Sequence, residues 1–126
     1  MITFETCGEL LDDIADSLPL DLYRNLNGGI ILLPEIKIHP KAVNNDLFIL
    51  GEYRHDNLGR YIVIFYGSFQ RVYGNLPIEA FKQKLDETLR HELRHHNEFL
   101  AGYNDLVIYD NKKISQYLKN KQENGS

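Results

Sequence analysis

The sequence predicts an α+β fold, in which a small mixed β-sheet carries an N-terminal helix and a long second helix packed on it. Three patterns predict this class: apolar residues at helical spacing near the N-terminus, two apolar segments in the middle, and a long amphipathic pattern after them. The 126 residues and the 43 % share of hydrophobic residues suit one globular domain. We therefore expect a single domain over residues 1–119 and a polar tail over residues 120–126.

The N-terminal third is expected to contain two helices and one strand. Residues 3–17 place acidic side chains on one helical face and apolar side chains on the other. A proline at the start suits a short second helix over residues 19–26, which a run of turn-forming residues ends. Residues 30–33 follow as an apolar strand. Residues 34–46 show little periodicity, and we expect a loop there.

The middle of the chain is predicted to be an antiparallel hairpin. Residues 47–53 and 60–66 are rich in β-branched, aromatic and aliphatic side chains, as strands are. The intervening residues 54–59 are turn formers, with Gly59 at a position suited to left-handed backbone. The second strand has two interpretations: an edge strand that binds an extended peptide, or a central strand of the sheet.

Helices are expected in the last part of the chain. Residues 68–73 suit one short helical turn. A long helix is predicted over residues 77–101, with Gly102 as its left-handed C-terminal cap. A last short helix is expected over residues 111–119.

The long helix has three faces when its residues are placed at about 100° each. Between the core face and the solvent face lies a narrow stripe that contains His91, His95 and Glu98, within about 60° of one another. Glu92 and His96 point toward the core side, where a charged or polar group needs a partner or a function. The predicted core face consists of Ile78, Phe81, Leu85, Leu89, Leu93, Phe99 and Leu100.

The motif HExxH occupies residues 91–95 of this helix. Three of the five histidines of the chain fall within six residues here. Two imidazoles at positions i and i+4 project from one helical face and can both bind one Zn²⁺ ion. The glutamate beside the first histidine reaches the metal's water instead of the metal. The pattern thus predicts His91 and His95 as zinc ligands and Glu92 as general base.

The segment over residues 89–96, which reads LRHELRHH, resembles the small bacterial zincin-like metallopeptidase family, whose members carry HExxHH. Upstream, Leu50-Gly51-Glu52-Tyr53 and the apolar strand after it are similar to the family's strands, so the resemblance covers most of residues 3–106. It implies a minimal zincin with a small mixed sheet, a motif helix packed on it, bound zinc and peptidase activity.

The third zinc ligand is open. Many members of the family continue as HExxHxxGxxD, but here Glu98 stands at the glycine position and Ala101 at the aspartate position. Glu98 is the first candidate, either as a ligand or as a residue that orients His95. Asp105 is the second candidate, since the chain can fold back after a turn at Gly102, and Asp110 is the third.

The composition of the chain limits which partners it can bind and where in the cell we expect it. The 14 basic and 18 acidic residues give a net charge of −4, which argues against nucleic-acid binding by bulk charge. A single cysteine excludes an internal disulfide and a cysteine-based metal site. No apolar run is long enough to cross a membrane, and the first residues lack a signal-peptide pattern, so we expect a cytoplasmic protein.

A zinc peptidase acting on a peptide or protein is the leading functional hypothesis. The alternatives are a non-catalytic zinc-binding or interaction protein and a metal-dependent hydrolase of another class, such as a small nuclease. Because a chain of this size cannot wall off a deep cleft, we expect a shallow site, weak activity, or a partner protein that completes the site.

Overall fold

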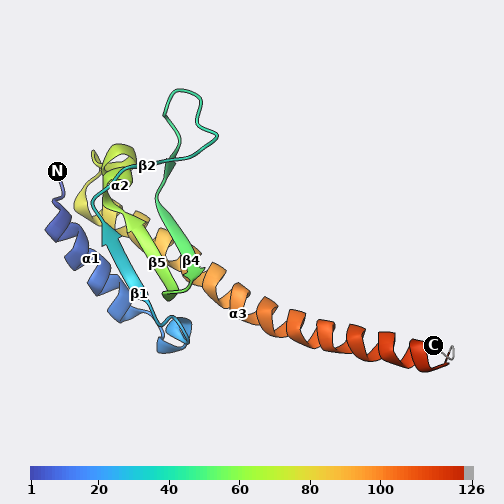
Figure 1. Cartoon of the computed structure of the whole chain (residues 1–126). Coiled ribbons are helices and arrows are strands. Elements are labelled where there is room, and N and C mark those ends of the chain that lie inside the picture. Colours follow the sequence, from blue (N-terminus) through green and yellow to red (C-terminus); the bar gives the residue numbers. More distant parts are fainter. Residues whose placement is uncertain (124–126) are drawn as a thin grey trace. The chain divides into compact units, whose positions relative to one another are not determined.

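A computed structural model of the chain describes the backbone of residues 1–123 and the side chains of residues 1–102. The chain divides into two compact units, Met1–His96 and Asn97–Ser126. Figure 1 labels its elements in chain order. They are α1 (Phe4–Ser17), the 3₁₀ helix η1 (Leu20–Tyr23), β1 (Gly29–Leu33), β2 (Lys37–Ile38), β3 (Phe48–Ile49), β4 (Gly51–Asp56), β5 (Gly59–Phe65), α2 (Tyr66–Tyr73) and α3 (Ile78–Glu123).

Helix α1 forms because its apolar residues recur once per turn and its first residue is capped. The Thr3 hydroxyl accepts a hydrogen bond from the backbone N–H of Thr6, which satisfies one of the unpaired amides of the first turn. Cys7, Leu11 and Ile14 are buried on the inner face. Burial raises the pKa of the Cys7 thiol to about 12, so the thiol is protonated at neutral pH.

The main sheet is mixed and has the strand order β1-β5-β4. Strand β5 pairs with β1 in parallel and with β4 in antiparallel orientation, so β5 is the central strand. The β4–β5 hairpin confirms the predicted hairpin, and its turn brings Gly59 to a φ of 117°, which only glycine adopts readily. Of the two interpretations of residues 60–66, the central strand is therefore correct.

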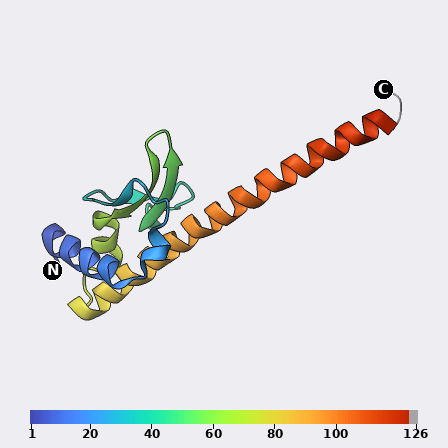
Figure 2. The same cartoon turned by 90° about the horizontal axis from the view of Figure 1, so that it is seen from below.

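Helices α1 and the first part of α3 cover one face of this sheet (Figure 2). Ile62 and Ile64 of β5 project into the layer between sheet and helices and are fully buried. The fold is therefore α+β, with the N-terminal helix and the motif helix on a small mixed sheet, as the sequence predicts. The helices contribute Cys7, Leu11, Ile14, Phe81, Leu85, Leu89 and Leu93 to this core.

The segment around the second, smaller sheet differs from the prediction. Residues 34–46 are predicted as a loop, but they contain β2, which pairs with β3 in antiparallel orientation. The predicted strand over 47–53 is divided at Leu50 into β3 and β4, because each half pairs with a different strand. The two-residue strands β2 and β3 exist because they pair with each other across the intervening loop, and not because of their local propensity.

The helical elements also differ in length. The residues predicted as one turn over 68–73 belong to α2, which begins at Tyr66 directly after β5. The segment 19–26 contains only the 3₁₀ helix η1.

The predicted end of the long helix at Ala101 is wrong. Helix α3 continues through Gly102 to Glu123, and the helix expected over residues 111–119 is part of it. The positive-φ glycines among the described residues are Gly29 and Gly59, so Gly102 is not a left-handed cap. A glycine inside a helix costs only about 1 kcal/mol relative to alanine, which does not by itself end a helix. Most of the segment 120–126 expected as a tail is thus helical.

No helix in the described part of the chain combines the length and the apolar character that crossing a membrane requires.

Candidate metal centre

Helix α3 places the HExxH residues by the register of its buried side. Phe81, Leu85, Leu89 and Leu93 recur every four residues and are at most 1 % exposed. This spacing fixes the rotation of the helix about its axis, because the apolar row must face the sheet. His91 and His95 consequently emerge on the exposed side of the helix, one turn apart.

The two imidazoles lie face to edge, with ring centroids 4.5 Å apart. The Nε2 atoms of His91 and His95 are 2.9 Å from each other. Two nitrogen ligands of a tetrahedral zinc ion, each at about 2.0–2.1 Å, stand about 3.3 Å apart. A small rotation of either exposed ring gives that separation, so the pair fits the donor geometry of zinc.

Glu92 completes the group from the buried side. One ligand atom from each of His91, Glu92 and His95 lies within 4.8 Å of the other two. The Glu92 side chain is only 7 % exposed, whereas both histidines are exposed. Burial raises the pKa of Glu92 and Glu52 adds to the rise, while His91 and His95 oppose it. A carboxylate with a raised pKa, held beside two imidazoles, is a suitable proton acceptor for water.

The candidates for a third ligand lie outside this group. Glu98 belongs to the second compact unit, which begins at Asn97. The side chains of Asp105 and Asp110 lie outside the described residues. The predicted turn after Gly102, which would bring Asp105 back, is not present, because α3 is helical there. Which residue is the third ligand therefore stays a prediction, with Glu98 as its first candidate.

His96 has the buried position that its helical angle predicts. Its side chain is fully buried, its Nδ1 lies 2.7 Å from the hydroxyl of Tyr53, and its Nε2 lies 2.7 Å from the backbone oxygen of Arg24. Burial lowers the pKa of His96. His96 is thus a core residue that connects α3 to β4 and to the end of η1, and it does not point to the imidazole pair.

Gly51 brings the strand β4 close to the motif helix. A Cβ atom added to Gly51 would lie 3.1 Å from the Thr88 methyl group, 3.1 Å from the Ile64 side chain and 3.2 Å from the Val63 oxygen. A larger residue would therefore push strand and helix apart. Sequence reasoning missed this role, although the glycine between apolar strand residues was a usable signal.

A cavity of about 350 Å³ lies beside the group, between the β3–β4 segment and α3. His91 and Glu92 form part of its wall, together with Gly51 and Thr88.

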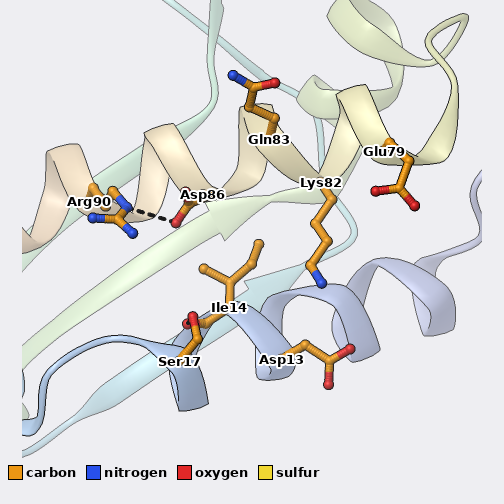
Figure 3. A pocket seen from close by; sticks show the side chains of 8 residues that line it. All are labelled: Asp13, Ile14, Ser17, Glu79, Lys82, Gln83, Asp86 and Arg90. Carbon is orange, nitrogen blue, oxygen red and sulfur yellow. Dashed lines mark hydrogen bonds and ion pairs between the residues drawn. The ribbon is translucent and has the colours of Figure 1, made fainter.

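A second cavity of about 310 Å³ lies between α1 and α3, and none of the HExxH residues lines it. Figure 3 shows the Asp86–Arg90 ion pair along its wall and Lys82 extending from α3 toward α1. Its lining carries side chains of both charges, and it is separate from the His91–Glu92–His95 group.

Comparison with known proteins shows a likeness to a solved structure. No family model matches the chain, and no curated protein matches it. A solved structure, that of a conserved hypothetical protein from Thermus thermophilus, matches with a TM-score of 0.69 and 35 % sequence identity. The match covers 80 % of this chain and 99 % of that chain, so the shared part is the whole of the bacterial protein. On this identity and coverage, the chain belongs to the family of the conserved hypothetical protein from Thermus thermophilus.

Proposed function

We propose that the protein is a zinc-dependent, metallopeptidase-like hydrolase with His91 and His95 as zinc ligands and Glu92 as general base. The observation that carries the proposal is a pair of Nε2 atoms 2.9 Å apart beside the buried Glu92, a residue that is 7 % exposed. In an HExxH site the two histidines bind the metal and the glutamate acts on the metal-bound water. Two exposed histidines beside a buried glutamate match these separate roles.

Each side chain has a separate role in hydrolysis. Zinc, when bound, supplies a lowered water pKa and polarisation of the substrate carbonyl. The Glu92 carboxylate accepts the proton of the attacking water and passes it to the leaving amine. Its burial raises the pKa of the carboxyl group, which favours uptake of the proton. Glu98 is proposed as the third ligand or as a residue that orients His95.

A peptide or protein is the proposed substrate. The cavity beside the group is bordered by the β3–β4 segment, and β4 is one of the two outer strands of the three-stranded sheet. Extended peptides bind to such strands through backbone hydrogen bonds. A cytoplasmic location and a partner protein that completes the site stay predictions from the sequence.

The test is zinc content and peptide hydrolysis measured on purified wild-type protein and three variants. Glu92→Gln should retain one zinc per chain and lose hydrolysis by at least about 100-fold, because it keeps the shape but not the proton acceptor. His91→Ala should lose zinc and hydrolysis together. Glu79→Gln, an exposed acid in the first turn of the same helix, is the matched control and should behave as wild type.

Other outcomes point to the alternatives. Stoichiometric zinc with no cleavage of any peptide in a library would favour the non-catalytic zinc-binding protein. Cleavage of RNA but not of peptides would favour a hydrolase of another class. Equal hydrolysis by Glu92→Gln and wild type would refute the proposed mechanism.

A further inference from the structure

The cavity between α3 and the β3–β4 segment is large enough to hold a long side chain. Its volume is about 350 Å³, at the low end of the roughly 300–1,000 Å³ of ligand pockets. His91 and Glu92 lie in its wall, so a group that fills it also lies next to these two side chains. On the proposed function, a substrate side chain in this space belongs to a residue close to the reacting bond.

The wall on the strand side is apolar. Phe48, Ile49 and Leu50 line it in sequence, and all three are only partly buried. The Arg71 guanidinium lies over the Phe48 ring, 5.5 Å from its centre, so the uncovered apolar surface is the part that Arg71 does not cover. The hydrocarbon stem of a long side chain gains free energy by covering such surface. A short polar side chain would leave it exposed to water.

The wall on the helix side carries negative charge. Glu87 and Glu92 line the cavity, and its lining includes no lysine or arginine. Glu87 pairs with Lys84, whose Nζ lies 3.4 Å from Glu87 Oε2. The Lys84 side chain is 38 % exposed and the Glu87 side chain is 53 % exposed. Exposed ion pairs of this kind contribute little stability.

Lys84 also has a second partner, which it keeps if a cation of the substrate displaces it from Glu87. Its Nζ lies 5.6 Å from the centre of the Tyr73 ring, within cation–π range. Glu87 is thus available to a cationic group at small cost, whereas an acidic side chain would meet two carboxylates.

We propose that this cavity binds a lysine or arginine side chain of the substrate, with the stem on Phe48–Leu50 and the charged end at Glu87. As the specificity of a peptidase this rests on the proposed function, but side-chain binding does not need the metal.

The test is binding of fluorescein-labelled pentapeptides Ala-Ala-X-Ala-Ala to metal-free protein, followed by fluorescence anisotropy, with lysine, leucine or glutamate at X. We expect the lysine peptide to bind about 1.5-fold to fivefold tighter than the leucine peptide, the range that an exposed ion pair provides. The glutamate peptide should bind weakest.

Two variants distinguish binding in the cavity from a general attraction between the peptide and the net charge of the protein. Glu87→Gln should abolish the preference for lysine over leucine. Glu79→Gln changes net charge by the same amount but lies at the other cavity (Figure 3), and it should keep the preference. A lysine preference that survives Glu87→Gln, equal binding of lysine and leucine, or no binding of any peptide would overturn the inference.

Failure of the proposed function has a different signature. A lysine preference that depends on Glu87, in a protein that neither binds zinc nor hydrolyses peptides, would leave a binding cavity and remove the peptidase. Zinc-dependent hydrolysis with no preference at X would support the peptidase and refute the binding of a lysine or arginine side chain in the cavity.

Discussion

His95 and His96 are adjacent in the sequence but differ in environment. His95 is exposed beside His91, whereas His96 is fully buried between Tyr53 and the carbonyl of Arg24. Because a carbonyl oxygen only accepts hydrogen bonds, His96 Nε2 carries the proton, and Nδ1 accepts from the Tyr53 hydroxyl. The neutral ring is fully satisfied in this arrangement, in agreement with its lowered pKa.

Removal of the His96 ring should therefore destabilise the fold. His96→Ala leaves a cavity in the core and removes the hydrogen bonds to Tyr53 and to the Arg24 carbonyl, and we expect a loss of about 3 kcal/mol in the free energy of unfolding. His95→Ala, at an exposed position, should change it by no more than about 0.5 kcal/mol. Urea unfolding of the metal-free proteins measures both. Equal losses in the two variants would contradict the assignment of His96 to the core.

The third ligand can be identified by metal affinity. If Glu98 binds zinc or orients His95, Glu98→Ala should weaken zinc binding at least about tenfold, the lower limit for residues that support a ligand. Asp105→Ala and Asp110→Ala should then bind zinc as wild type. Competition with a chelator of known affinity gives the comparison. A large loss in Asp105→Ala with none in Glu98→Ala would move the assignment to Asp105.

At the scale of elements, the distance between β4 and α3 is set by Gly51. The strand and the helix approach so closely that a Cβ at Gly51 meets the Thr88 methyl group at 3.1 Å. Thr88 is one turn before Glu92, and both line the cavity. The glycine thus controls both the packing of the helix and the width of the space beside His91 and Glu92.

Gly51→Ala should separate the two elements by a few tenths of an ångström. We expect a loss of about 1–2 kcal/mol in unfolding free energy, typical of an added methyl group in a packed interface. Gly8→Ala in α1 is the control, since its Cβ would have its nearest contact at 3.7 Å. Thermal and urea unfolding test the pair, and an unchanged stability of Gly51→Ala would mean that helix and strand adjust without cost.

At the scale of the molecule, a charge cluster connects the two sheets. Glu52 of β4 forms ion pairs with Lys37 of β2 and with Arg54, at 2.8 Å in the case of Arg54. Lys37 and Arg54 also lie over the Phe65 ring, 5.4 and 5.9 Å from its centre. The smaller sheet is thereby held to the face of the main sheet that α1 and α3 do not cover.

This cluster should make stability depend on pH. Burial alone would raise the pKa of Glu52, but hydrogen bonds from Lys37 and Arg54 outweigh it and the pKa is lowered. A lowered carboxyl pKa stabilises the fold above the unfolded-state value of about 4.3, and the contribution disappears as pH falls through the folded-state value. Because the partners are more than a third exposed, we expect only about 0.5–1 kcal/mol.

The measurement compares unfolding free energies at about pH 6 and about pH 3, on either side of this titration. Wild type should lose about 0.5–1 kcal/mol more on acidification than Glu52→Gln, whose side chain does not titrate. Glu9→Gln, at an exposed position of α1, should follow wild type. An identical pH dependence of wild type and Glu52→Gln would show that the ion pairs contribute nothing.

Local patterns alone determined much of this protein. Helix α1, the β4–β5 hairpin with its turn at Gly59, and the placement of His91 and His95 on one face all follow from spacings within a few residues. The same helical arithmetic placed Glu92 and His96 on the buried side. These features are predictable because the backbone period fixes where a side chain points relative to its near neighbours.

Only the tertiary structure decided what lies across from those side chains. His96 meets a carbonyl 72 residues away, β2 exists because β3 pairs with it, and β5 is central because β1 joins it in parallel. The cavity at Gly51 and the continuation of α3 past Gly102 also escaped the sequence analysis. Long-range partners depend on the shape and hydrogen-bonding capacity of surfaces that form when distant segments pack, which no local spacing encodes.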